Sequence, residues 1–153
     1  MTYVDEPAIE EYLDPLMVII ISSAKCRSEL PFRYRFMKLI PLYQIVPARL
    51  YIPLGHLARA VFESDYKREE EVFRAMLNAK DPQFVKRAIR LTVRWQHTEC
   101  SDRIVHIHGT RDHTLPLRNI ADPIAIEGGS HMMALTESEA ISGLINQLLD
   151  KYR

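Results

Sequence analysis

The sequence predicts an α/β fold in which a short parallel sheet of about three strands has flanking helices and an inserted helical segment. The first strand is predicted by the aliphatic run Leu16–Ile21, which two serines close. A continuous run rich in Ile and Val, bounded by small polar residues, is typical of a strand buried on both faces. Residues 103–108 (RIVHIH) and 123–126 (PIAI) are expected to form two more short strands. Each run ends in small or polar residues before a loop, which favours a parallel arrangement.

The composition is that of one globular domain of ordinary size. The chain has 153 residues, of which 47% are hydrophobic and 26% charged, so it can bury a sizeable core. Twenty basic and twenty acidic residues give a formal net charge of zero, which argues against a general nucleic-acid binder. Disordered, collagen-like and disulfide-framework classes are excluded by the same composition.

The chain start and the cysteines suggest a soluble cytoplasmic protein. The first twelve residues are acidic where a secretory signal would be basic and then apolar. The longest aliphatic run has six residues, whereas a membrane span needs about 20. Cys26 and Cys100 are the only cysteines. We expect both to be free thiols in a reducing compartment.

Residues 7–62 predict short elements. A short helix is expected from Pro7 to Leu13, because Asp14-Pro15 disfavours its continuation. Four prolines interrupt the stretch from Cys26 to about Phe62, so it should hold short helices and loops. From residue 25 to residue 49, six basic residues stand against one glutamate, a net charge of +5. This segment is interpreted as a solvated face, with an anion- or membrane-facing patch as the alternative.

Three longer helices are predicted after this stretch. The first covers Tyr66–Lys80, and Asp81-Pro82 supplies the N-cap and first-turn proline of the second, which runs to about Gln96. The third follows Thr136 and Glu139, which have the spacing of a capping box. Their apolar faces, at helical spacing, are expected to be core: Val72, Phe73, Met76 and Leu77; Phe84, Val85, Ala88, Ile89 and Val93; Ile141, Leu144, Ile145, Leu148 and Leu149.

Ligands of open α/β sheets gather at the carboxyl ends of the strands. The polar residues expected there are Ser22, Ser23, Asp112 and His131. The segments RIVHIHGTRDHTLP and PIAIEGGSHMMALTE carry a strand ending in His-Gly, an aspartate three residues after that glycine, a short strand and GGSH before a helix. In this order they resemble the end of an α/β-hydrolase.

The resemblance implies a serine hydrolase of ester or other acyl bonds that needs no cofactor and no metal. Asp112 would be the acid that orients and supports His131, and His131 would act first as general base and then as general acid. The resemblance covers nearly the whole chain as one domain, residues 1–153. Residues 1–26 match a helix and buried strand, residues 27–100 a helical lid, and residues 101–153 the last two strands and the C-terminal helix.

The lid resemblance also implies candidate contacts for a small, apolar, ester-like substrate. The candidates are large apolar side chains, which could instead form the core of the lid itself: Phe32, Phe36, Phe73, Met76, Phe84 and Trp95.

The chain departs from the family because it contains no GxSxG, the motif of the nucleophile. It therefore resembles the carboxyl-terminal half of a hydrolase, and the lone chain is expected to be inactive without a nucleophile. The alternative is a non-catalytic, truncated or degenerate hydrolase that serves as a binding or assembly module. The strand Met17–Ser22 would have an open edge, so we expect self-association or pairing with a separate amino-terminal half.

A second alternative is a metal site. His106 and His108 alternate along a strand, so both rings face one side, as metal ligands require. The string HIHGTRDH is similar to the HxHxDH signature of metallo-β-lactamase-like hydrolases, but Asp112 follows His108 by four residues instead of two. The other interpretation is a pair of buried strand histidines that are satisfied by hydrogen bonds. Neither GxGxxG nor GxxxxGK[ST] occurs, which argues against nucleotide binding.

Overall fold

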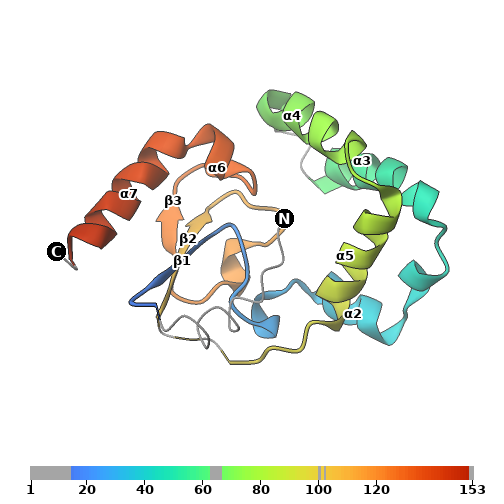
Figure 1. The fold of residues 1–153 in the computed structure, drawn as a ribbon, viewed down its shortest axis with the longest axis horizontal. Helices are drawn as coiled ribbons and strands as arrows, with labels where there is room; N and C mark the ends of the chain where they lie inside the picture. Colours follow the sequence, from blue (N-terminus) through green and yellow to red (C-terminus); the bar gives the residue numbers. More distant parts are fainter. Residues whose placement is uncertain (1–14, 63–66, 100, 102, 152–153) are drawn as a thin grey trace. The chain divides into compact units, whose positions relative to one another are not determined.

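The computed structural model describes residues 15–62, 67–99, 101 and 103–151 (Figure 1). The described chain divides into two compact units. The helical unit comprises residues 26–98, and the sheet unit comprises residues 15–25 and 99–151. The helical unit coincides closely with the segment that the sequence analysis treats as an insertion. The helix expected from Pro7 to Leu13 lies outside the described residues.

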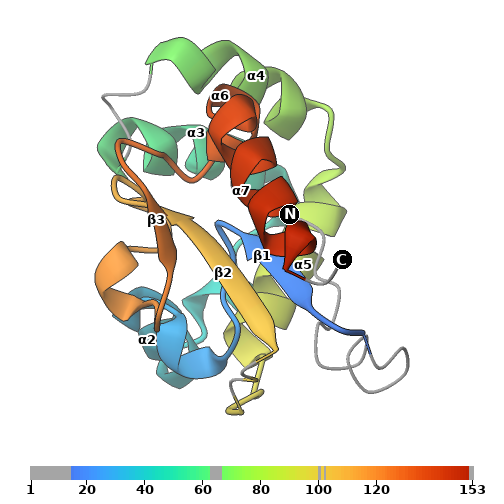
Figure 2. The same cartoon turned by 90° about the vertical axis from the view of Figure 1, so that its left-hand side faces the viewer.

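The sheet unit contains a three-stranded parallel sheet in the order β1-β2-β3. The strands are β1 (Val18–Ile21), β2 (Ile104–Gly109) and β3 (Ile124–Ile126), which lie side by side in Figure 2. Ile20 is in register with His106, and His108 with Ala125. The prediction of an α/β class with a short parallel sheet and flanking helices is thus confirmed. Parallel order also brings the three carboxyl ends to one edge of the sheet.

Two helices, α6 (Met133–Thr136) and α7 (Ser138–Asp150), follow the sheet. Ile107, Ile126, Met133 and Ile141 form the buried core of the unit, and Leu144 and Ile145 of α7 pack against it. The predicted apolar face of the last helix is confirmed at these positions, whereas Leu149 is exposed.

The capping box predicted for the last helix is wrong. Thr136 is the last residue of α6, so it does not occupy the N-cap of α7. That place is taken by Glu137, which makes no side-chain capping hydrogen bond. A separate helical turn before α7 moves the helix start two residues beyond Thr136, which the spacing of the motif did not reveal.

The helical unit consists of short elements up to residue 50 and longer helices after it. They are η1 (Arg27–Glu29), α2 (Phe32–Leu39), η2 (Leu42–Gln44), η3 (Ala48–Leu50), α3 (Tyr51–Phe62), α4 (Lys67–Asn78) and α5 (Pro82–Arg94). Elements α2, η2, η3 and α3 pack against α5, and α4 packs against α3. The predicted start of α5 is confirmed, because the Asp81 carboxylate accepts a hydrogen bond from the Gln83 N–H at 3.0 Å.

The apolar stripes of α4 and α5 are only partly core. Val93 is buried, whereas Val72, Met76 and Phe84 are exposed. For these three residues the expectation of a core position is wrong. The apolar side chains of a helix are buried only where a neighbouring helix packs on them. The extent of that packing cannot be predicted from the spacing of the apolar residues.

The expectation of free thiols is wrong for Cys26, which is fully buried and disulfide-bonded. Cys100, the only other cysteine of the sequence, lies outside the described residues. A disulfide requires two α-carbons to come within about 7 Å, which separation along the sequence cannot reveal. Disulfides persist mainly in oxidising compartments, so this bond does not support the predicted cytoplasmic location. None of the described helices has the length and apolar character needed to cross a bilayer.

Candidate active site

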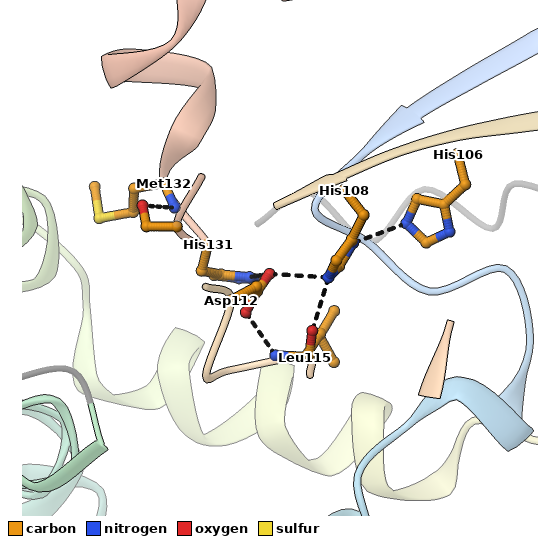
Figure 3. A network of polar contacts seen from close by, with 7 residues as sticks. His106, His108, Asp112, Leu115, His131 and Met132 are labelled. Carbon is orange, nitrogen blue, oxygen red and sulfur yellow. Dashed lines mark hydrogen bonds and ion pairs between the residues drawn. The ribbon is translucent and has the colours of Figure 1, made fainter. Parts of the chain in front are cut away.

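Asp112 lies in the turn that follows β2, and its carboxylate is buried (Figure 3). One oxygen, Oδ1, accepts a hydrogen bond from the Leu115 N–H at 2.7 Å. The other, Oδ2, lies 2.8 Å from Nδ1 of His131 and 3.3 Å from Nε2 of His108. The backbone of the turn and two imidazoles therefore hold this carboxylate in one orientation.

His131 follows β3 and precedes α6. Its Nδ1–H donates to Asp112 Oδ2, which fixes the tautomer and leaves the lone pair on Nε2. The His131 side chain is 21% exposed, whereas that of Asp112 is fully buried. Among the described residues His131 makes no other polar contact, so Nε2 is free to accept a proton.

Backbone hydrogen bonds join the loop of Asp112 to the loop of His131. The Thr110 N–H donates to the Ile126 carbonyl at 3.0 Å, and the Arg111 N–H to the Gly129 carbonyl at 2.9 Å. The Thr110 hydroxyl accepts a further bond from the Gly128 N–H at 2.9 Å. Gly128 has a φ of 73°, which a side chain would disfavour. These contacts bring Asp112 and His131 together, as predicted for strand ends at one sheet edge.

A third imidazole, that of His106, extends this network through His108 along β2. His108 Nε2 donates to the Leu115 carbonyl at 2.7 Å, and Nδ1 of the same ring lies 3.1 Å from His106 Nε2. Because Nε2 of His108 faces only acceptors, it must carry a proton. In a neutral His108, Nδ1 is then the acceptor and His106 the donor. The network thus runs from His106 through His108 and Asp112 to His131.

His106 is held neutral by its surroundings. Burial is the largest cause of a pKa of His106 lowered to about 3, and electrostatic interactions with His108 and Lys25 contribute to the same decrease. A backbone hydrogen bond with Ser23 and the carboxylate of Asp112 act in the opposite direction. At neutral pH the inner end of the network is therefore an uncharged imidazole.

The two strand histidines bond to each other, with their ring planes at 90°. Within the part of the chain that the structure describes, no group of three or more histidine, cysteine or acidic residues could hold a metal ion. The arrangement fits the interpretation of buried strand histidines that hydrogen-bond to each other, and it provides no geometric support for the metal alternative.

The six substrate-contact candidates all lie in the helical unit. Phe32, Phe36, Met76 and Phe84 are exposed. Phe73 is half-buried and packs against His56 and beneath the Arg59 guanidinium, while Trp95 stacks on His97. Contact of these six side chains with a substrate stays a prediction.

Sequence reasoning missed two features of the site. The first is the link between His108 and Asp112, for which the alternation of His106 and His108 on the strand before Asp112 was the available signal. The second is the left-handed backbone of Ser22, a residue expected at this sheet edge, which directly follows β1 and has a φ of 47°. The Ser22 hydroxyl is buried and has no hydrogen-bond partner in the described residues. Backbone strain of this kind leaves no mark on the local sequence.

Comparisons of the chain with protein-family models, with curated protein sequences and with solved structures find no significant match.

Proposed function

We propose that Asp112 and His131 are the acid–base pair of a hydrolase that acts on ester or related acyl bonds. The observation that carries this proposal is the 2.8 Å hydrogen bond between His131 Nδ1 and the buried Oδ2 of Asp112. A buried carboxylate and a partly exposed imidazole, joined in this way, form the part of a catalytic triad that moves the proton.

Each residue has a distinct task in this reaction. Asp112 holds the His131 ring with its proton on Nδ1 and stabilises the imidazolium that forms. His131 Nε2 takes the proton from an attacking hydroxyl and then delivers it to the leaving group. His108 and the Leu115 N–H orient the carboxylate.

In this proposal the nucleophile lies outside these 153 residues. The 153 residues contain no GxSxG. Ser130 is beside His131 in sequence, but its hydroxyl accepts a hydrogen bond from the Met132 N–H at 3.0 Å. The Ser22 hydroxyl has no hydrogen-bond partner among the described residues and so is not bonded to His131. A segment that presents a serine hydroxyl to His131 Nε2 completes the site.

The absence of GxSxG also favours a second candidate, a binding or assembly module that performs no turnover. In this case the Asp112–His131 hydrogen bond serves only to hold the two loops together. The two candidates differ in whether Nε2 of His131 can take part in acyl chemistry.

Hydrolysis of p-nitrophenyl acetate by the purified chain separates the two candidates. This activated ester reacts with a free imidazole without a serine, so the catalytic proposal predicts slow hydrolysis above background. His131→Ala should abolish it, and Asp112→Asn should lower it by about 10²-fold because the tautomer is no longer fixed. His113→Ala is the matched control, since His113 lies next to Asp112 but is exposed.

Equal rates for the wild-type chain and His131→Ala would exclude the acid–base role and favour the binding module. A fluorophosphonate probe adds a second readout. It should not label the chain alone, and it should label the serine of a polypeptide that completes the site when the two are mixed.

A further inference from the structure

The charges of this protein are separated along the chain although their sum is zero. The segment 26–98 carries fourteen basic and seven acidic residues, a net charge of +7. Residues 30–62 and 82–98 contain no acidic residue at all. These two stretches include α2, η2, η3, α3 and α5, which pack together in the helical unit.

The same region exposes an unusual amount of aliphatic surface. Residues 39–45, here called the apolar tip, connect α2 to η2 and end just after η2. Leu39 and Ile45 are each 78% exposed, Leu42 is 62% exposed and Ile40 is 45% exposed. Helix α2 has no buried residue, and Phe32 and Phe36 on it are exposed too. A contiguous apolar surface of this kind marks an interaction site.

Hydrogen bonds from α3 and α5 hold the backbone of the apolar tip in place. The side chain of Tyr43 is buried, and its carbonyl accepts a hydrogen bond from the Tyr51 hydroxyl at the start of α3. Lys86 of α5 donates to the carbonyls of Gln44 at 2.9 Å and Val46 at 2.8 Å. The backbone of the tip is thus tied to two helices while four aliphatic side chains stay in solvent.

We propose that the helical unit binds the surface of a lipid bilayer that contains anionic phospholipids. The side chains of the apolar tip enter the headgroup–acyl boundary, and the exposed Arg35, Lys38 and Arg49 contact the lipid phosphates. This inference does not rest on the proposed hydrolase function.

Charge and side-chain composition favour a lipid surface over a second copy of the chain or a nucleic acid as the partner of this face. A second copy of the chain would present the same positive charge, which opposes self-association through this face. Single-stranded nucleic acid is bound through aromatic platforms on which bases stack, whereas the tip presents mainly leucine and isoleucine. An anionic bilayer offers both an apolar interior for the side chains of the apolar tip and negative charge for the basic residues around it.

Co-sedimentation of the full chain with vesicles tests the proposal. We expect binding to vesicles of phosphatidylcholine mixed with phosphatidylglycerol, much weaker binding to phosphatidylcholine alone, and weaker binding as salt is raised. The double variant Arg35→Gln/Lys38→Gln should weaken binding about 25-fold, since each basic residue near the surface contributes about fivefold. The double variant Leu39→Ser/Ile45→Ser should weaken it about tenfold or more.

The controls are substitutions of exposed residues in the sheet unit. Leu135→Ser matches the leucine substitution at 60% exposure, and Arg118→Gln matches the loss of charge. Both should bind vesicles like the wild-type chain, and circular dichroism should show all variants folded. The proposal is overturned if the chain does not sediment with anionic vesicles, binds neutral vesicles equally well, or loses binding equally in the control variants. If the wild-type chain does not bind vesicles but the tip variants lose a dimer, the surface is assigned to a second copy of the chain. If they lose nucleic-acid binding instead, it is assigned to nucleic acid.

Discussion

A side chain on Gly109 would collide with the backbone of Gly129. A β-carbon built on Gly109 lies 2.2 Å from the carbonyl oxygen of Gly129 and 2.4 Å from its carbonyl carbon. Gly109 ends β2, three residues before Asp112, and Gly129 lies two residues before His131. The close approach of these two glycines is therefore what lets the acid and base loops meet.

Substitution of Gly109 should reduce both stability and the acid–base contact. We expect Gly109→Ala to lower the free energy of unfolding by about 3 kcal/mol, because rigid backbone has to move to admit the methyl group. Gly143→Ala is the control, since a β-carbon there meets nothing within 4 Å and lies inside α7. Gly143→Ala should raise the free energy of unfolding by about 0.5–1 kcal/mol. Urea unfolding measures both, and an unchanged midpoint for Gly109→Ala would contradict the packing argument.

Substitution of Ser22 by glycine, unlike that of Gly109 by alanine, is expected to stabilise the protein. Its φ of 47° lies in the left-handed region, and its buried hydroxyl has no hydrogen-bond partner in the described chain. Glycine adopts this conformation without strain, so Ser22→Gly should raise the free energy of unfolding by about 1 kcal/mol. The same substitution at Ser142, an exposed position inside α7, should lower it by about 0.5–1 kcal/mol. Thermal or urea unfolding of the two variants decides this, and destabilisation by Ser22→Gly would show that its hydroxyl matters to the fold.

The buried His106 should make the protein sensitive to acid. Its pKa is about 3 in the folded chain, against an ordinary value of 6.5. As the pH falls from about 6.5 towards 3, the unfolded chain binds a proton that the folded chain rejects. The free energy of unfolding should therefore decrease with falling pH by up to about 1.4 kcal/mol per pH unit from this group, and not change above pH 6.5.

Unfolding curves of the wild-type chain and His106→Asn, measured between pH 3.5 and pH 7.5, isolate this contribution. The variant is expected to be less stable at neutral pH, because His108 loses its partner ring, and to depend less on pH in the acid range. Parallel pH profiles for the two proteins would exclude His106 as the acid-sensitive group.

The sheet could be predicted from the sequence because its signals are local. The aliphatic run before Ser22, the short runs before Gly109 and Gly128, and the polar ends of all three are visible in consecutive residues. Parallel order then places those ends at one edge, and the structure brings Asp112 and His131 into hydrogen-bonding contact there.

The features that escaped prediction depend on tertiary contacts. The start of α7 depends on the extra turn α6, and the exposure of Val72 and Met76 depends on how far α3 covers α4. The disulfide bond of Cys26 and the left-handed φ of Ser22 likewise give no signal in the local sequence. None of these features can be inferred from spacing or periodicity.

The open side of β1 has one remaining consequence. Val18 and Ser22 direct their amides to β2, so the peptide groups of Ile19 and Ile21 face away from the only strand that borders β1 in the described sheet. A further segment that paired with these peptide groups would add a fourth strand on the side of β1 remote from β3. The register of the three existing strands would not change. Pairing of a further strand with this edge would therefore cost no existing ladder bond of the described sheet.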